Sequence, residues 1–394
     1  MRFILGLFFT VTLAHVLIAY NLPWQIYQEF FPFQDLLYKF YDFYPFTAYG
    51  NFDGYPYIAI AKHWYSDLQQ SYFPLFPITI IAFAKVFFIK NYLVAAVFAS
   101  AVLFLSGLFF ARKLFLFLTG GNESITKWAI AFLVLFPTGF FYQVVYPESL
   151  YLFLSSAGLY FLFTKRYRWA LIFGVLASLA KVQGVLLLLP YFLMIFAIPY
   201  QKNLVTFTKS YLLSIKRHAK LLIYACAPAY GILLYAGYLF ISVGDPLYFY
   251  HTQAAFGAHR SVNTIVTLPQ VLYRYIKIFI TAEHDFIYWI AVLEFSIFLL
   301  VFSVMCIALY RLLRSKRGFD LPNISLQLYS LVVLILPTLT GTLTSVPRYA
   351  LISLGFFVAL AQIPNRYVKY SFAIVFSILQ IVLFVYFLKG YFVS

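Results

Sequence analysis

Long apolar runs separated by short polar connectors follow one another along the whole chain. The first occupies residues 3–19 and the last residues 371–388. A helix needs about 20 apolar residues to cross the hydrocarbon core of a bilayer. The pattern therefore predicts an all-α polytopic membrane protein with about ten or eleven transmembrane helices. No small-residue cleavage site follows the first run, which favours a retained span over a signal peptide.

The distribution of charge along the connectors predicts which side of the membrane each one occupies. Arg2 precedes the first apolar run, and basic residues favour the inside. Residues 21–72 carry five acidic residues against Lys39 and Lys62, which places this segment outside. We therefore expect one domain over residues 1–394, with a first outer loop at 21–90 and a second at 244–283. Both loops should contain short juxtamembrane helices.

Several segments are too short or too long for one simple crossing. Residues 73–89 sit at the lower length limit for a span, and a full crossing there would place later basic connectors outside. A re-entrant or interfacial helix is therefore predicted. Residues 169–199 lie between two basic connectors, which predicts a hairpin of two short helices that turns at residues 181–184. Residues 128–145 and 347–363 are each expected to form one span.

Composition and charge exclude a soluble protein. The chain has 394 residues, of which 64% are hydrophobic and 10% charged, and its mean hydropathy is +0.88. The net charge of +16 would suggest nucleic-acid binding in a soluble protein. Here the basic residues lie mainly in short connectors, so topology and contact with lipid headgroups explain them, and no nucleic-acid partner is predicted. Charged residues inside or beside apolar runs become functional candidates.

The first outer loop contains the leading catalytic candidate, Asp53. An Asp-Gly pair such as Asp53-Gly54 is by itself an ordinary turn signal. Its position after the first span, followed by Trp64-Tyr65 and the segment FPLFP, makes a functional role more specific. A carboxylate within reach of an acceptor hydroxyl could take its proton as a general base.

Three further charged residues fall at the same predicted outer face. Glu148 begins an apolar run after Pro147, where it could also complement a helix dipole. Lys181 interrupts an apolar run, and either snorkelling or phosphate binding explains it. Arg348 lies at the outer mouth of a predicted span, where arginine suits bidentate phosphate recognition. Glu148 is thus a second catalytic candidate, and Lys181 and Arg348 are candidates for binding a donor phosphate.

Other polar residues of the two outer loops are candidates for contact with substrate. The His and Asp spacings match no zinc motif, and these residues are compatible with a divalent metal without requiring one. The substrate-loop candidates are Gly54, His63, Asp245, His251, Gln253, His259 and Arg260.

Several segments in this order resemble one family of enzymes. The chain reads FDGYPYIAIAKHWY, YFPLFP, FPTGFFYQVVYPESLYLFLSSAGLYFL, GVLASLAKVQGVLLLLP, GDPLYFYHTQAAFGAHR and SVPRYAL. Together they resemble the PIG-V-like mannosyltransferases, the GPI second-mannose family, and their bacterial relatives. The resemblance extends over residues 50–355.

This resemblance implies a GT-C glycosyltransferase fold with its active site on the outer side. It implies a polyprenyl-phosphate sugar as donor, with mannose as the expected sugar, and a glycolipid or glycan as acceptor. Asp53 matches the acidic residue of the family, Glu148 its Pro-Glu-Ser corner, and Lys181 a position where the family usually carries arginine. The short loops favour a prokaryotic plasma membrane over the endoplasmic reticulum membrane of a eukaryote.

The expected function is inverting transfer of a hexose, with Asp53 as general base. A transporter or lipid-linked-sugar flippase is the alternative, and it predicts an internal repeat or paired broken helices. Neither is visible in the sequence. A purely structural membrane protein would give no reason for charged residues to gather at one face.

Overall fold

The computed structural model describes residues 1–22, 34–43, 45–198, 204–252, 265–314 and 320–393, with the side chains of 204–207 excepted. These residues form helices joined by turns, and no strand occurs among them. Five helices are long and apolar enough to cross a membrane, and they confirm an all-helical, multispan protein. They are α1 (Arg2–Asn21), α5 (Tyr92–Leu118), α15 (Phe286–Leu313), α16 with η8 (Leu321–Thr340) and α19 (Arg366–Leu388).

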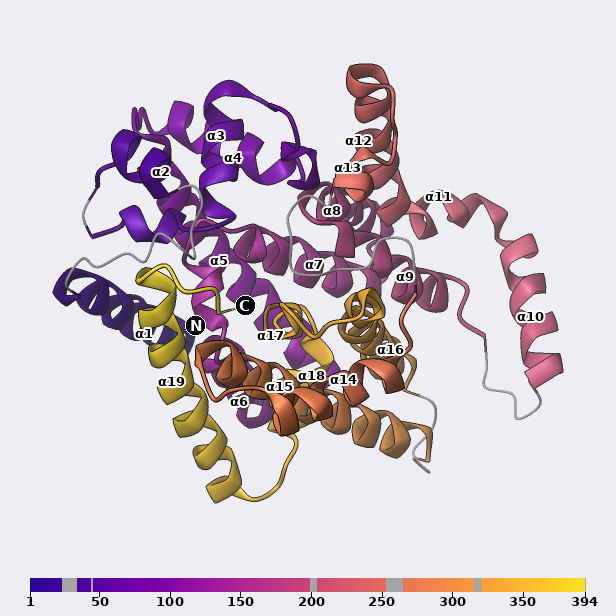
Figure 1. Ribbon diagram of the computed structural model, residues 1–394. Helices are drawn as coiled ribbons and strands as arrows, with labels where there is room; N and C mark the ends of the chain where they lie inside the picture. The colour runs from indigo at the N-terminus through magenta and orange to yellow at the C-terminus, as the bar shows by residue number, and fades with distance from the viewer. Residues whose placement is uncertain (23–33, 44, 199–203, 253–264, 315–319, 394) are drawn as a thin grey trace.

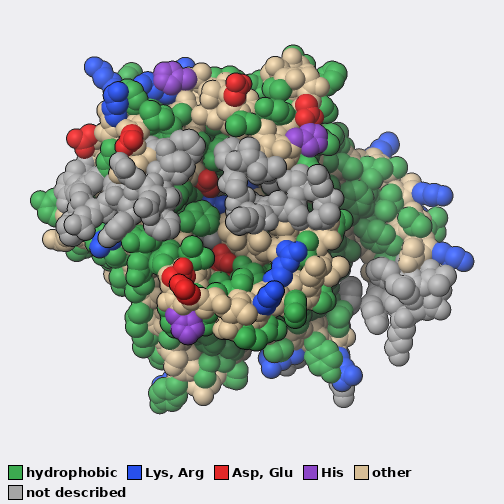
Figure 2. Space-filling model, viewed as in Figure 1, with side chains coloured by type: hydrophobic (Ala, Val, Ile, Leu, Met, Phe, Trp, Pro, Cys, Tyr) green, Lys and Arg blue, Asp and Glu red, His purple; other side chains and the backbone are tan. Residues whose placement is uncertain are grey.

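A bent pair of helices forms either a sixth, broken span or a re-entrant segment. The segment Ala219–Ala225, which contains η6 (Ala219–Leu221) and α11 (Leu222–Ala225), meets α12 (Ala227–Val243) at an angle of 61°. Figure 2 shows hydrophobic side chains over much of the face in view, as expected for a surface in contact with lipid. The described residues thus contain five or six spans by length and composition, fewer than the ten or eleven expected.

Short apolar helices account for this difference. They are α6 (Glu123–Leu135), α7 (Glu148–Phe163), α8 (Tyr167–Ala180) and α9 (Leu188–Ile195), the last preceded by η5 (Val182–Leu187). The short helix α4 (Leu75–Val86) lies in the segment that was predicted to be re-entrant. In Figure 1, α5, α7 and α8 occupy the middle of the molecule, and α7 packs against α5, α8 and α9.

The helical hairpin predicted for residues 169–199 is confirmed. Helix α8 ends at Ala180, Lys181 is extended, and η5 turns the chain towards α9. Gly184 permits this turn because a Cβ atom there would lie 2.4 Å from the backbone nitrogen of Ser178.

The single spans predicted for residues 128–145 and 347–363 are wrong. Helix α6 ends before Pro137 and is followed by η4 (Gly139–Tyr142). The second segment divides into α17 (Val346–Ala350) and α18 (Leu354–Ala361). Proline cannot donate the backbone hydrogen bond that a continuing helix needs, and Pro137 lies where α6 ends.

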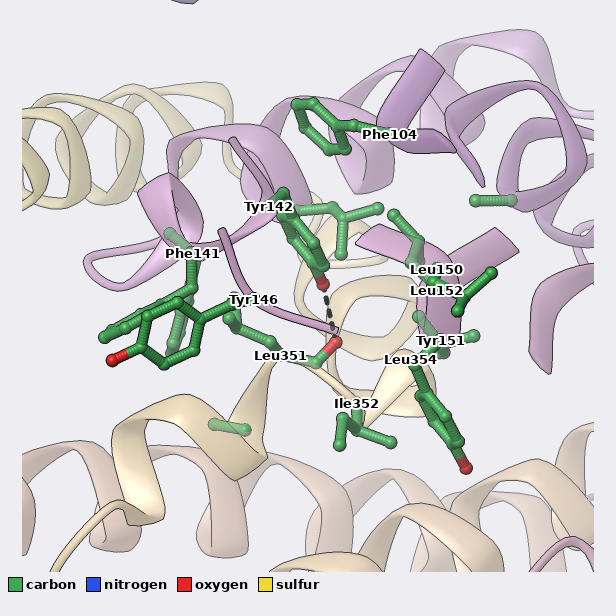
Figure 3. Close-up of a cluster of buried hydrophobic side chains, with 14 of the residues drawn as sticks. Phe104, Phe141, Tyr142, Tyr146, Leu150, Tyr151, Leu152, Leu351, Ile352 and Leu354 are labelled. Carbon is green, nitrogen blue, oxygen red and sulfur yellow. Dashed lines mark hydrogen bonds between the residues drawn. The ribbon is translucent and has the colours of Figure 1, made fainter. Parts of the chain in front are cut away.

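Side chains of the first broken segment donate hydrogen bonds to backbone carbonyls of the second. Thr138 Oγ1 donates to the Pro347 carbonyl at 2.7 Å, and the Tyr142 hydroxyl donates to the Leu351 carbonyl at 2.9 Å (Figure 3). From α19, Gln380 Nε2 donates to a carbonyl at the end of α6, that of Val134, at 2.9 Å. Non-helical backbone within a membrane protein persists where such partners exist. Phe104 of α5 stacks on Tyr142 and fixes this junction.

The predicted outer loops contain the expected short helices. The first holds α2 (Gln34–Phe40), η2 (Thr47–Gly50), α3 (Gly54–His63), η3 (Gln69–Ser71) and α4. The second holds α13 (Tyr248–His251) and α14 (Leu268–Thr281), and α10 (Leu204–Arg217) lies between α9 and η6. Twelve residues in α4 extend about 18 Å, less than the hydrocarbon thickness of about 30 Å. This length suits the predicted re-entrant helix, and the side on which each loop lies stays a prediction.

Candidate active site

Four charged side chains from distant parts of the chain meet in one ion network. Arg348 Nη1 donates to Asp53 Oδ2 at 2.8 Å, although the two residues are 295 positions apart. Lys181 Nζ donates to Glu148 Oε1 at 2.6 Å. Arg348 Nε lies 3.6 Å from the same Glu148 oxygen and joins the two pairs. The structure thus brings together the catalytic and phosphate-binding candidates that the sequence indicates.

Burial differs sharply along this network. The Glu148 side chain is 1% exposed, Arg348 is 11%, Lys181 is 12% and Asp53 is 34% exposed. The two acidic and two basic groups give the network no net charge. This balance lowers the cost of burial, because an unpaired buried charge is strongly destabilising. The Asp53 carboxylate is the accessible end, and Glu148 lies beneath the two basic groups.

Local backbone contacts hold Asp53 in this position. The Val145 amide donates to the Tyr49 carbonyl at 3.0 Å, which joins the first loop to the segment before Glu148. At the start of α3, a Cβ atom on Gly54 would lie 3.3 Å from the Val145 carbonyl oxygen. Gly54 is therefore buried at a close backbone approach beside the network. Asn51 Nδ2 donates to the Phe387 carbonyl at 2.9 Å and ties the same turn to α19.

Tyrosines surround Asp53, and the sequence did not single them out. The Tyr72 hydroxyl donates to Asp53 Oδ1 at 3.3 Å, and the Asp53 amide donates to the Tyr146 hydroxyl at 3.3 Å. The Arg348 guanidinium lies 5.5 Å from the centre of the Tyr146 ring. Burial, and then the charge of Asp53, raises the pKa of Tyr72 well above its usual value, so this hydroxyl remains a donor. The chain has 35 tyrosines. The only sequence signals for these two are that Tyr72 precedes FPLFP and that Tyr146 precedes Pro147-Glu148.

A second buried carboxylate holds the segment that precedes Arg348. Glu294 in α15 is 4% exposed, and its Oε2 accepts from the Tyr275 hydroxyl at 2.6 Å. The Leu343 amide donates to the Tyr275 hydroxyl at 3.0 Å, and Arg274 Nη1 donates to the Gly341 carbonyl at 3.0 Å. Helix α14 is thereby tied to the chain leading into α17. A glutamate inside a long apolar run was the signal that could have identified Glu294.

The remaining substrate-loop candidates lie outside the ion network. His63 is exposed at the far end of α3, roughly 13 Å along the helix from Gly54. His251 Nδ1 pairs with Asp245 Oδ2 at 2.6 Å, and this hydrogen bond lowers the pKa of Asp245. Three further candidates lie outside the described residues: Gln253, His259 and Arg260.

The two outer loops nevertheless touch beside the network. The hydroxyls of Ser71 and Thr252 are 2.7 Å apart, and Ser71 Oγ donates to the Phe249 carbonyl at 3.2 Å. Ser71 immediately precedes Tyr72, the hydroxyl donor to Asp53. Among the described residues, no group of three or more His, Cys, Asp or Glu side chains is arranged to hold a metal ion.

Fold and site together define a polytopic helical membrane protein in which distant loops assemble a buried acid–base cluster. No protein-family model matches the chain, and no curated protein matches it. The chain is similar to a solved structure of the Archaeoglobus fulgidus oligosaccharyltransferase in the apo form, with a TM-score of 0.46 and 13% identity over 98% of this chain. It is also similar to oligosaccharyltransferase AglB from Archaeoglobus fulgidus in complex with an inhibitory peptide and a dolichol-phosphate, with a TM-score of 0.42 and 12% identity over 97% of this chain. The chain spans 56% and 55% of the length of those chains.

Proposed function

We propose that the protein is a membrane glycosyltransferase of the GT-C type. It moves a hexose, for which mannose is the first choice, from a polyprenyl-phosphate donor to a glycolipid or glycan acceptor at the outer face of the membrane. The observation that carries this proposal is the position of Asp53, the accessible end of an otherwise buried network, in hydrogen-bond contact with Arg348. The resemblance of the surrounding segments to PIG-V-like mannosyltransferases supports the choice of donor and sugar.

In the proposed reaction, Asp53 takes the proton of the acceptor hydroxyl as that oxygen attacks the anomeric carbon of the sugar. The bond from this carbon to the phosphate oxygen breaks, and polyprenyl phosphate leaves with the bonding electrons. A single displacement inverts the configuration of the sugar. The activated sugar arrives attached to lipid, so the protein needs no nucleotide-binding domain.

Arg348 and Lys181 supply positive charge for the departing phosphate. A guanidinium has five N–H donors, and the contacts of Arg348 with Asp53 and Glu148 involve Nη1 and Nε. Its Nη2 group makes no hydrogen bond with a described residue and is the donor proposed for a phosphate oxygen. Glu148, buried against both cations, acts in this proposal as a positioning residue, because its side chain is only 1% exposed.

A lipid-linked-sugar flippase or other transporter is the second candidate, because the broken segments α6–η4 and α17–α18 lie side by side. Paired broken helices are typical of transporters. One experiment separates the two functions. The full chain is reconstituted in liposomes with polyprenyl-phosphate-[³H]mannose and a mixture of glycolipid acceptors. A transferase releases polyprenyl phosphate and labels an acceptor, whereas a flippase leaves the donor intact and changes its accessibility to periodate. Transbilayer movement without bond cleavage would overturn the proposal.

Arg348→Lys tests the proposed phosphate contact while keeping the positive charge. Lysine cannot reproduce the planar, multi-donor geometry of the guanidinium. Loss of one charge-assisted hydrogen bond, worth about 1.5–3 kcal/mol, predicts a fall in kcat/KM for the donor of about 10- to 100-fold. Arg366→Lys, at an exposed arginine that begins α19, is the matched control and should leave the kinetics unchanged. Equal kinetics in both variants would contradict a role for Arg348.

A further inference from the structure

A cavity of about 300 Å³ lies between α15, α16 and the end of α18, away from the ion network. Its polar lining includes Arg311 from the last turn of α15, Gln327 from α16, and Gln362, which follows α18. Arg311 is roughly 38 Å along the helix from Phe286, the first residue of α15. Because Glu294, nearer that first residue, connects through Tyr275 to the chain before Arg348, the cavity occupies the opposite end of α15.

Two lining groups have unused bonding capacity. Arg311 is exposed and makes no hydrogen bond or ion pair with any described residue. Gln362 is exposed, and its side chain makes no hydrogen bond with any described residue. The cavity therefore offers a positive charge for an anion and an acceptor for a hydroxyl or amine.

The apolar side of the cavity indicates a lipid. Val304, Ile307 and Ile363 line it, and Ile307 is 51% exposed, so an apolar side chain at the cavity also faces the surroundings of the protein. Arg311 lies at the end of α15 that the distribution of basic residues places inside. Basic pockets between transmembrane helices on that side suit phospholipid headgroups.

We propose that this cavity binds the headgroup of an anionic glycerophospholipid of the inner leaflet. The lipid phosphate contacts the Arg311 guanidinium, a headgroup hydroxyl donates to Gln362 Oε1, and an acyl chain follows Val304 and Ile307. Phosphatidylglycerol has this combination of a phosphate and hydroxyl donors. The site is separate from the ion network and does not depend on the proposed transferase activity.

Native mass spectrometry of the full chain in mild detergent, titrated with phosphatidylglycerol or phosphatidylcholine, tests this site. One phosphatidylglycerol should bind with a preference of about tenfold or more over phosphatidylcholine. Arg311→Gln should weaken its binding by about tenfold or more. Arg314→Gln is the matched control, since Arg314 is exposed near the end of the same helix, lies outside the cavity lining and stacks on Tyr310 at 4.9 Å. Equal binding by the two variants would overturn the proposal.

A variant that fills the cavity separates a lipid site from a general attraction of charge. Ala308 lines the cavity, and Ala308→Phe should abolish phosphatidylglycerol binding while Arg311 remains. Thermal unfolding of the variant without added lipid identifies any loss of folding, and binding is compared at a temperature where both proteins are folded. Unchanged binding by folded Ala308→Phe would place the lipid elsewhere. Displacement of the lipid by inorganic phosphate at equal concentration would show a free-anion site and would also refute the proposal.

Discussion

Replacing Asp53 with asparagine is expected to lower kcat for sugar transfer by about 10²- to 10⁴-fold, the usual contribution of a general base. Asparagine keeps the size of the side chain and an oxygen that can accept from Arg348, but its amide cannot take the acceptor proton. The fall should therefore appear in kcat, with little change in the KM for the donor. The measurement is turnover of polyprenyl-phosphate-mannose by the purified protein, with the acceptor saturating.

Asp67→Asn is the control for this experiment. Asp67 belongs to the same predicted outer loop, and it is exposed and forms no ion pair among the described residues. Its substitution should leave kcat unchanged, which separates the role of Asp53 from the general charge of the loop. Undiminished turnover by Asp53→Asn would rule out Asp53 as the base.

The second large effect concerns stability. Glu148→Gln and Lys181→Met should each lower the free energy of unfolding by about 3–5 kcal/mol, because each leaves a buried charge without its hydrogen-bonded partner. The double variant should lose less than the sum of the two, by at least about 1 kcal/mol, since the unpaired charge is then gone. Chemical unfolding of the purified protein in micelles measures the three differences.

An exposed ion pair provides the reference for this comparison of the single and double variants. Arg112 and Glu123 form an ion pair with side chains 28% and 50% exposed. Substitution of either residue with glutamine should change the free energy of unfolding by no more than about 1 kcal/mol, because solvent screens such pairs. Strictly additive losses at Glu148 and Lys181 would show that their contact contributes nothing.

Some features of the candidate site could be predicted from the sequence because they are local. A charged residue beside an apolar run costs free energy and is therefore a functional candidate. This criterion identified Glu148, Lys181 and Arg348 individually. The Asp-Gly turn after the first span marked Asp53. Glu294 lies inside an apolar run and meets the same criterion, so the sequence could also have identified this residue.

The tyrosine partners could not be predicted in the same way. Tyr72 and Tyr146 are two of 35 tyrosines, and aromatic residues in a membrane protein mostly face lipid or the interface. Their contacts with Asp53 depend on how the first loop meets the segment before α7. No pattern in the neighbouring residues encodes that meeting.

The sequence by itself determined the helical, membrane-spanning character of the chain, because hydropathy and the cost of charge act at each position independently. Pro137 marks the end of α6 in the sequence, but only the tertiary structure supplies the distant donors that stabilise carbonyls at the breaks near α6 and α17, such as Gln380 on Val134 and Thr138 on Pro347. The tertiary structure also decided that Asp53 meets Arg348 across 295 residues. A contact at that separation depends on the packing of every helix between its ends, which no local pattern can specify.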